Sequence, residues 1–164
     1  MNPNPLIKTL ADINSKPKIE IKRLSPTANL PTRATEGSAG MDVYANIPAT
    51  VWVRPDENLL VPLGIAININ DPSMVAILAG RSGLALKKKV RLGQGIGVID
   101  SDYQDEIGAI IYNDGSEPFA INPQDRIAQL LFMPVIQVDW NEVTEFSEGS
   151  NRGGGFGSTG VAAQ

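Results

Sequence analysis

The sequence predicts a single all-β domain. Short β-branched runs separated by Pro, Asn, Asp and Gly recur along most of the 164-residue chain, and no part of the core keeps a 3.6-residue apolar period. The length suits one hydrophobic core, with little room for a second. Short strands separated by turn residues at such regular intervals are typical of a β-barrel or β-sandwich.

The first strand is expected at the apolar positions Ile19, Ile21 and Leu24, and the second at Val51 and Val53. Further apolar, β-branched runs predict strands within residues 59–69, 74–78, 96–99, 107–112, 119–121 and 127–138. We expect at most one short helix in the core, at Ser82 to Leu86.

Both ends differ in composition from this domain, which we place at residues 19–148. Residues 1–18 are polar and predict an N-terminal arm; Pro5 to Ser15 could form a short helix, or the segment could be a loosely docked tail. Residues 149–164 form a second arm, and Gly149 to Gly160 is half glycine. Glycine richness is typical of a flexible linker, but this segment links no second domain, and its polar residues also suit a lid over an anionic ligand.

Absent residue types narrow the chemistry. The chain has no Cys and no His, which excludes thiol nucleophiles, disulfides, Ser-His-Asp triads and the usual zinc sites. A general base must therefore be a carboxylate, Lys or Tyr. The net charge of -4 argues against a general nucleic-acid binder. There is neither an apolar run of membrane-spanning length nor a secretory signal pattern, so we expect an intracellular (cytoplasmic) protein and no membrane partner.

Gly80-Arg81-Ser82-Gly83 combines flexible backbone, a guanidinium group and a hydroxyl group. It could hold a phosphate, or it could be a tight turn with an exposed Arg. The basic residues Lys87 to Lys89 and Arg91 follow; they could be a solvated edge or could help to attract a polyanion.

Residues 93–106 indicate a hairpin with close-set glycines, where main-chain groups could meet a planar base. Asp100, Asp102 and Tyr103 stand near its expected rim. The two acids could serve as a base catalyst or simply form a turn.

Five segments, in order, resemble the five motifs of the homotrimeric dUTPases. They are residues 37–42 (GSAGMD), 81–85 (RSGLA), 97–103 (GVIDSDY), 125–130 (DRIAQL) and 152–160 (RGGGFGSTG). The resemblance covers about Ile19 to Gly160 and implies a jelly-roll-like (β-clip) fold. It also implies a homotrimer with three active sites at subunit interfaces, dUTP as the substrate and Mg²⁺ as the cofactor.

The resemblance implies that Asp100 activates the water that attacks the α-phosphorus of dUTP, which gives dUMP and pyrophosphate. Tyr103 would lie under the deoxyribose and exclude a ribose 2′-OH. The segment from Gln94 to Gly108 would read uracil mainly through main-chain groups. The implied substrate-binding residues of the domain are Arg81, Ser82, Gly83, Gln94, Gly97, Val98, Ile99, Tyr103, Gly108 and Gln129.

The glycine-rich arm, by the same resemblance, would close over the active site of another subunit. Phe156 would stack on uracil, and Arg152, Gly157, Ser158 and Thr159 would contact phosphates. Mg²⁺ would be held by the phosphates and water without a direct protein ligand. Asp42 would either touch the water shell of the metal or order the first-motif turn, and Arg126 would form a salt bridge.

The chain departs from the family pattern at several turns. Lys89, Asp105 and Gln124 stand where glycine is common, Gly80 where proline is common, and Gln94 where many relatives have Asn. The arm is also one residue shorter between Arg and Phe than is usual. Two rival hypotheses are a dCTP deaminase, which shares the fold, and a regulatory protein that uses the fold to bind without turnover.

Overall fold

The computed structural model describes residues 16–147 and residue 149 of the chain. Its elements are β1 (Glu20–Arg23), β2 (Met41–Tyr44), β3 (Val51–Val53), β4 (Asn58–Pro62), β5 (Ile65–Asn68), β6 (Met74–Ala79), α2 (Ser82–Lys88), β7 (Val90–Leu92), β8 (Ile96–Ile99), β9 (Gly108–Asn113), β10 (Phe119–Ile121) and β11 (Arg126–Pro134). The domain is all-β with one short helix, as the short β-branched runs of the sequence predict.

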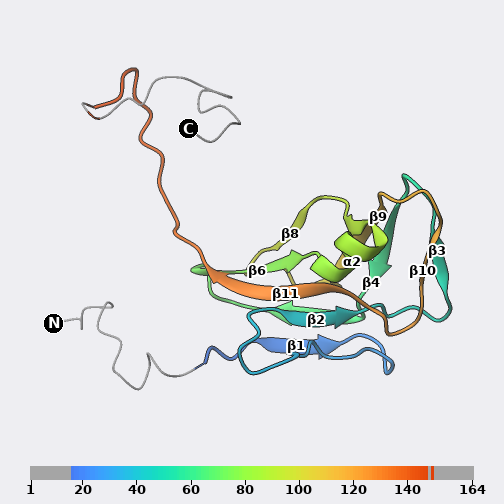
Figure 1. Ribbon diagram of the computed structural model, residues 1–164. Coiled ribbons are helices and arrows are strands. Elements are labelled where there is room, and N and C mark those ends of the chain that lie inside the picture. The colour runs from blue at the N-terminus through green and yellow to red at the C-terminus, as the bar shows by residue number, and fades with distance from the viewer. Residues whose placement is uncertain (1–15, 148, 150–164) are drawn as a thin grey trace.

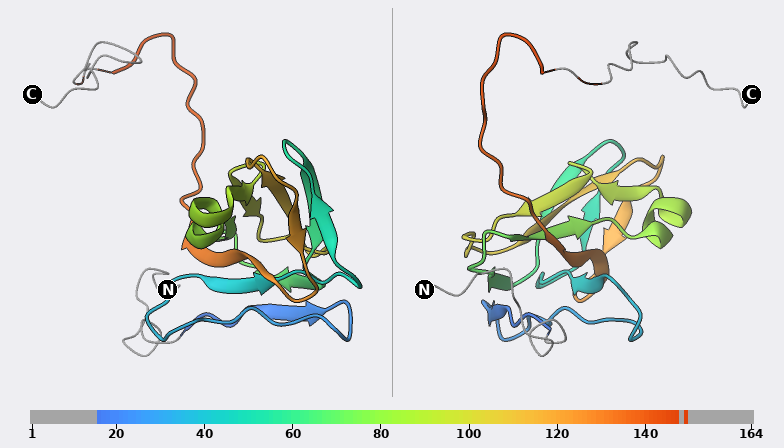
Figure 2. Two further views of the ribbon diagram at one scale, coloured as in Figure 1. Left: turned by 45° about the vertical axis from the view of Figure 1, so that its right-hand side comes forward. Right: turned by 90° about the vertical axis from the view of Figure 1, so that its left-hand side faces the viewer.

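The strands form small antiparallel sheets that pack around one interior (Figures 1 and 2). The largest has the order β2-β11-β6-β8, and a second has the order β4-β9-β7. The pairs β1-β5 and β3-β10 complete the described fold. After β11 the chain leaves the body of the domain, as Figure 1 shows in orange.

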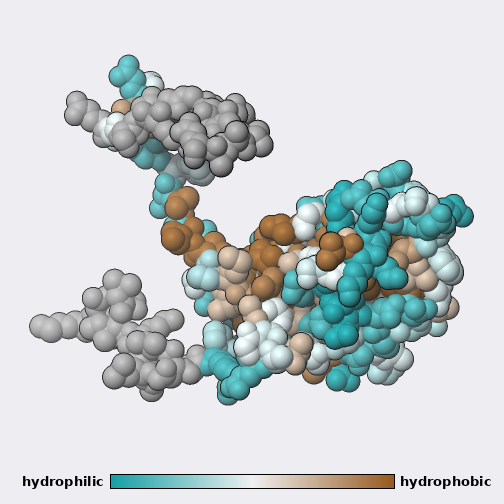
Figure 3. Space-filling model, viewed as in Figure 1, coloured by the Kyte–Doolittle hydropathy of each residue, from teal (hydrophilic) through white to brown (hydrophobic). Residues whose placement is uncertain are grey.

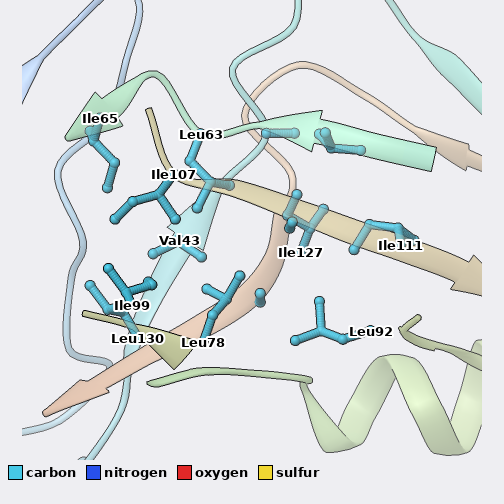
Figure 4. Close-up of a cluster of buried hydrophobic side chains, with 14 of the residues drawn as sticks. Val43, Leu63, Ile65, Leu78, Leu92, Ile99, Ile107, Ile111, Ile127 and Leu130 are labelled. Atoms are coloured by element: carbon cyan, nitrogen blue, oxygen red, sulfur yellow. The ribbon is translucent and has the colours of Figure 1, made fainter. Parts of the chain in front are cut away.

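Side chains from every sheet fill the core between them, and Figure 4 shows part of this cluster. Leu63, Leu78, Ile111 and Leu130 are each 1% exposed. Among the described residues, Asn113 is the one buried polar side chain. Its Nδ2 donates to the carbonyls of Val53 and Glu117 at 2.9 and 2.8 Å, and its Oδ1 accepts from Gly115 N at 2.9 Å. The amide therefore satisfies the irregular backbone at the end of β9.

Most expected strands are present. The run 59–69 is divided into β4 and β5 at Gly64, whose φ is +68°, and β11 ends at Pro134. The expected helix is present as α2 and extends two residues further, to Lys88. We did not predict β2 and β7, in which polar or charged residues interrupt the apolar positions: Asp42 in β2 and Arg91 in β7.

The expected hairpin within residues 93–106 is wrong. In the described chain, β8 pairs with β6, whereas β9 pairs with β4 and β7. The two strands flanking Asp100 to Ile107 therefore belong to different sheets. They diverge because β8 pairs with β6 at the edge of one sheet, while β9 lies at the centre of the other sheet.

No helix among the described residues is long and apolar enough to cross a membrane.

Candidate active site

A pocket of about 180 Å³ opens between the diverging strands β8 and β9. Its lining includes every domain residue that we assigned to base, sugar or catalysis: Gln94, Gly97, Val98, Ile99, Asp100, Tyr103 and Gly108. The structure adds Leu78 and Ile107, which sequence reasoning missed. Both are buried, and as ordinary apolar strand residues they carried no signal of a site.

Glycine keeps this pocket open at Gly97. In the sheet, Gly97 lies opposite Leu78, and a Cβ built on it would approach Leu78 Cβ to 3.1 Å and Gln94 Nε2 to 3.4 Å. A larger residue would therefore crowd the space that a ligand could use.

The strand β8 is an edge strand within the described chain, since it ends its sheet and pairs with β6. Alternate residues of an edge strand present unpaired N–H and C=O groups on the open side. A uracil ring offers an acceptor, a donor and an acceptor along one edge, so it complements a strand edge. Main-chain recognition of a base thus remains compatible with this arrangement, although the hairpin is absent.

Asp100 and Tyr103 lie at the mouth of the pocket, in the turn that follows β8. Tyr103 N donates to the Asp100 carbonyl at 3.2 Å, and the Tyr103 hydroxyl donates to the Glu106 carbonyl at 2.9 Å. Asp100 is exposed. Its carboxylate is thus accessible to solvent beside the pocket, as a water-activating base requires.

A second cluster lies at the other end of β6 and centres on Asp42. Its Oδ1 meets Arg81 Nε at 2.9 Å, and its Oδ2 meets Arg126 Nη1 at 3.2 Å. Arg81 Nη1 also donates to the Arg126 carbonyl at 2.9 Å. Arg126 forms the salt bridge that we predicted. Two of the five guanidinium donors of Arg81 are therefore used structurally, which leaves three for an anion.

Gln129 joins the glycine-rich segments to this cluster. Its Nε2 donates to the Gly80 carbonyl at 2.9 Å, and a Cβ on Gly40 would lie 2.6 Å from its Oε1. The glycine at position 40 thus leaves room for Gln129. Ser82 and Gly83 begin α2, where a Cβ on Gly83 would meet no atom within 4 Å. The backbone of this turn is therefore open to a ligand.

The two clusters are far apart in one chain. Ile99 pairs with Ala76, so Asp100 continues beside Val75, while Arg81 follows the last residue of β6, Ala79. Arg81 is six residues beyond Val75, which corresponds to about 20 Å of extended chain. Two P–O–P linkages are much shorter, so one triphosphate cannot place its α-phosphorus at Asp100 and its far end at Arg81 of the same chain.

A basic groove of about 770 Å³ extends from Arg81 along α2. Lys87, Lys88, Lys89 and Arg126 also line it. Glu117 and Asp125 also line it, so positive charge predominates. The groove could raise the local concentration of polyanions despite the net negative charge of the chain.

Some predicted site residues lie outside the described residues: Arg152, Phe156, Gly157, Ser158 and Thr159. Among the residues that the structure covers, no group of three acidic side chains could hold a metal ion. The fold and the described site define a small β-protein with a base-sized pocket beside a carboxylate and a separate arginine cluster.

Comparison with known proteins identifies the family. The dUTPase family model matches residues 27–160. The chain is 47% identical to the deoxyuridine 5'-triphosphate nucleotidohydrolase of Legionella pneumophila (strain Paris), over 87% of this chain and 94% of that protein. It is 50% identical to the protein of the same name from Neisseria meningitidis serogroup C, over 80% of this chain and 87% of that protein.

Solved structures of phage dUTPases share the fold. A Staphylococcus bacteriophage 80alpha dUTPase mutant with dUpNHpp has a TM-score of 0.76 and 27% identity, over 89% of this chain and all of that chain (100%). A mutant dUTPase from phage phi11 of S. aureus, described with a structural Mg(II) ion, has a TM-score of 0.72 and 24% identity, over 80% of this chain and 99% of that chain. The chain belongs to the dUTPase family.

Proposed function

We propose that this protein hydrolyses dUTP to dUMP and pyrophosphate, and thereby supplies dUMP for dTMP synthesis and keeps uracil out of DNA. The observation that carries the proposal is the pocket beside β8, where the predicted base, sugar and catalytic residues line one space. The family membership and the names of the relatives support the same substrate.

In this proposal Asp100 accepts a proton from water as the water oxygen attacks the α-phosphorus. The bond from that phosphorus to the α–β bridging oxygen breaks, and pyrophosphate leaves. The edge of β8 and Gln94 recognise uracil, and Gly108 lies against the base. The ring of Tyr103 lies under the deoxyribose, where a ribose 2′-OH would collide with it.

The triphosphate is bound by Arg81, Ser82, Gly83 and Gln129 of a neighbouring copy, because the two clusters of one chain are too far apart. We infer a homotrimer on this ground and on the family resemblance. A further support is the segment after β11, which leaves the body of the domain with exposed apolar side chains (Figure 3). Ile136, Trp140 and Phe146 are 87%, 94% and 96% exposed, and such side chains are typical of a surface that another chain covers.

We further propose that the arm at residues 149–164 closes over the site of another subunit, with Phe156 on uracil and Arg152, Gly157, Ser158 and Thr159 at the phosphates. Closure would exclude water and orient the triphosphate for in-line attack. Residues 19–148 would then be the β-domain and residues 1–18 an N-terminal arm. We place the reaction inside the cell.

The described side chains of the arginine cluster offer Mg²⁺ no free carboxylate, which suits an ion that is held by phosphate oxygens and water. Both oxygens of Asp42 already accept from arginine, so only its remaining lone pairs could meet a water of the ion. When bound, Mg²⁺ neutralises part of the triphosphate charge. The residues of the chain hold the nucleotide and move the proton.

The test is a pyrophosphate-release assay with dUTP, UTP, dTTP and dCTP in the presence of Mg²⁺. We expect strong preference for dUTP. Asp100→Asn should abolish turnover yet still bind a non-hydrolysable dUTP analogue, whereas Asp102→Asn, in the same turn, should remain active. Ammonia release from dCTP would support the deaminase instead, and nucleotide binding without turnover by the wild type would support the regulatory protein.

A further inference from the structure

The segment Asp100 to Ile107 is tied to the body of the domain along its length. The Ser101 carbonyl accepts from Asn70 N at 2.9 Å, and Gln104 Nε2 donates to Asn68 Oδ1 at 3.1 Å. These bonds fix the outer part of the segment to the end of β5 and the turn that follows it. They do not hold the ring of Tyr103, which depends on other contacts.

Tyr103 is held at both ends by the segment itself. Its backbone N–H donates to the Asp100 carbonyl, and its hydroxyl donates to the Glu106 carbonyl at 2.9 Å. The ring therefore spans the segment from the residue that follows β8 to the residue before Ile107. If the backbone at Glu106 moves, the phenol ring must move with it or lose this hydrogen bond.

The side chain of Glu106 is a second tie on that backbone, beside the Ile107 N–H, which donates to the Ile65 carbonyl at 2.9 Å. Glu106 Oε1 accepts from Gly64 N at 2.9 Å in a part-buried position. Gly64 has a φ of +68°, and its carbonyl accepts from Leu24 N at 2.8 Å. A Cβ on Gly64 would lie 2.5 Å from Asn46 Nδ2. Glu106 is thus bound to a turn that is packed and hydrogen-bonded on both sides.

We propose that Glu106 is a positioning residue that holds the Tyr103 ring against the sugar and so sets the discrimination between deoxyribose and ribose. This inference rests on the proposed function. Without the bond to Gly64, the peptide between Glu106 and Ile107 keeps the bond from Ile107 N to the Ile65 carbonyl but loses its second tie, so it can tilt and the ring can retreat. Retreat opens room for a 2′-OH and weakens contact with a 2′-deoxy sugar, so the two substrates become more alike.

The experiment compares kcat/KM for dUTP and UTP in the full-length protein. For Glu106→Ala we expect the dUTP-to-UTP ratio to fall by about tenfold, the size of effect that one steric contact in a pocket produces. Glu106→Gln keeps an acceptor oxygen at the same reach, and its ratio should stay within about twofold of the wild type. The ratio separates positioning from general damage, because loss of folded protein lowers both rates together.

Glu57→Ala is the matched control. Glu57 Oε2 accepts from Arg54 N at 2.7 Å in the turn before β4, so the same kind of bond is removed at a distance from the pocket. The dUTP-to-UTP ratio of Glu57→Ala should equal that of the wild type, although the melting temperature of this variant should fall. If Glu106→Ala does not fold, Glu106→Asp, which withdraws the carboxylate by one methylene, should still lower the ratio.

Tyr103→Phe removes the hydroxyl bond and leaves Glu106 intact, so it should lower the ratio in the same direction. An unchanged ratio in Glu106→Ala, or in Glu106→Asp where Ala does not fold, would overturn the inference and leave Glu106 with a structural role. Failure of the proposed function looks different, because the wild type would then not prefer dUTP at all.

Discussion

The arginine cluster permits a prediction that separates binding from catalysis. In Asp42→Asn the side chain keeps its shape but loses its charge and one acceptor oxygen. The present carboxylate is 13% exposed and bonds Arg81 at 2.9 Å and Arg126 at 3.2 Å. The substitution therefore leaves two guanidinium groups close together, with an amide NH₂ facing one of them.

The expected cost follows from the exposure of each pair. Arg81 is 28% exposed, so its charge-assisted bond should contribute about 1.5–2 kcal/mol, near the low end for bonds to charged groups. Arg126 is 53% exposed, and solvent screening limits that pair to about 0–1 kcal/mol. A loss of about 1.5–3 kcal/mol corresponds to a fall of about 3–12 °C in melting temperature for a chain of this length.

The functional consequence should appear mainly in KM. Arg81 loses the partner that fixes its guanidinium group, and one weakened contact with phosphate of about 1.4 kcal/mol corresponds to about a tenfold rise in KM. Asp100 makes no contact with Asp42 within the described chain and keeps its role as the base, so kcat should fall much less. Thermal melts and dUTP kinetics on the same preparations measure both effects.

Asp114→Asn is the matched comparison. Asp114 Oδ2 meets Arg91 Nε at 3.0 Å, but the side chains are 53% and 47% exposed. This pair should contribute less than about 1 kcal/mol, and its loss should leave KM unchanged. If Asp42→Asn and Asp114→Asn have the same melting temperature and the same KM for dUTP, Asp42 does not organise Arg81 for phosphate binding.

Three further outcomes are expected. Lys89 ends α2 with φ 54° and ψ 38°, so Lys89→Gly should stabilise the protein by about 0.5–1 kcal/mol in a thermal melt; a lower melting temperature would contradict this. Gly97→Ala adds a methyl group 3.1 Å from Leu78 Cβ, and calorimetry should show about tenfold weaker dUMP binding, whereas unchanged affinity would mean that the ligand lies elsewhere. The pKa of Tyr112 is raised from 10.0, first by its hydrogen bond to Asp56 and then by burial and by the charge of Asp56. Alkaline titration followed by phenolate absorbance should therefore show that Asp56→Asn lowers this pKa, and an unmoved titration would refute the assignment.

The family resemblance suggested the roles that we propose for the pocket residues, and most of these residues line one space because they are adjacent in sequence. Gly97 to Tyr103 form one strand end and one turn, so local chemistry brought them together whatever the sheet arrangement. Leu78 and Ile107 could not be predicted as pocket residues, because their part depends on which strand lies beside β8. Sheet pairing is a long-range property, and the mistaken hairpin has the same cause.

Backbone conformation explains why the family favours glycine at two of the departing positions. Lys89 and Gln124 both have positive φ, at 54° and 66°, whereas Asp105 is not among the positive-φ residues of the described chain. Gln124 has a compensation: its Nε2 donates to the Thr27 carbonyl at 2.7 Å and its Oε1 accepts from Asn29 at 2.5 Å. These partners lie more than ninety residues away, so the sequence alone could not reveal them.

The length of β6 has a consequence for assembly that mixed subunits can test. In the proposed homotrimer, Asp100→Asn and Arg81→Ala should each abolish activity, since every proposed site uses both residues. If each site takes Asp100 from one chain and Arg81 from a neighbour, equal mixing of unfolded chains before refolding should restore about one quarter of the sites. Each such site pairs the intact Asp100 of one variant with the intact Arg81 of the other. A site built within one chain would recover nothing, because every chain carries a defect. An inactive mixture of well-folded oligomers would therefore refute the division of the site between copies and the about 20 Å separation on which it depends.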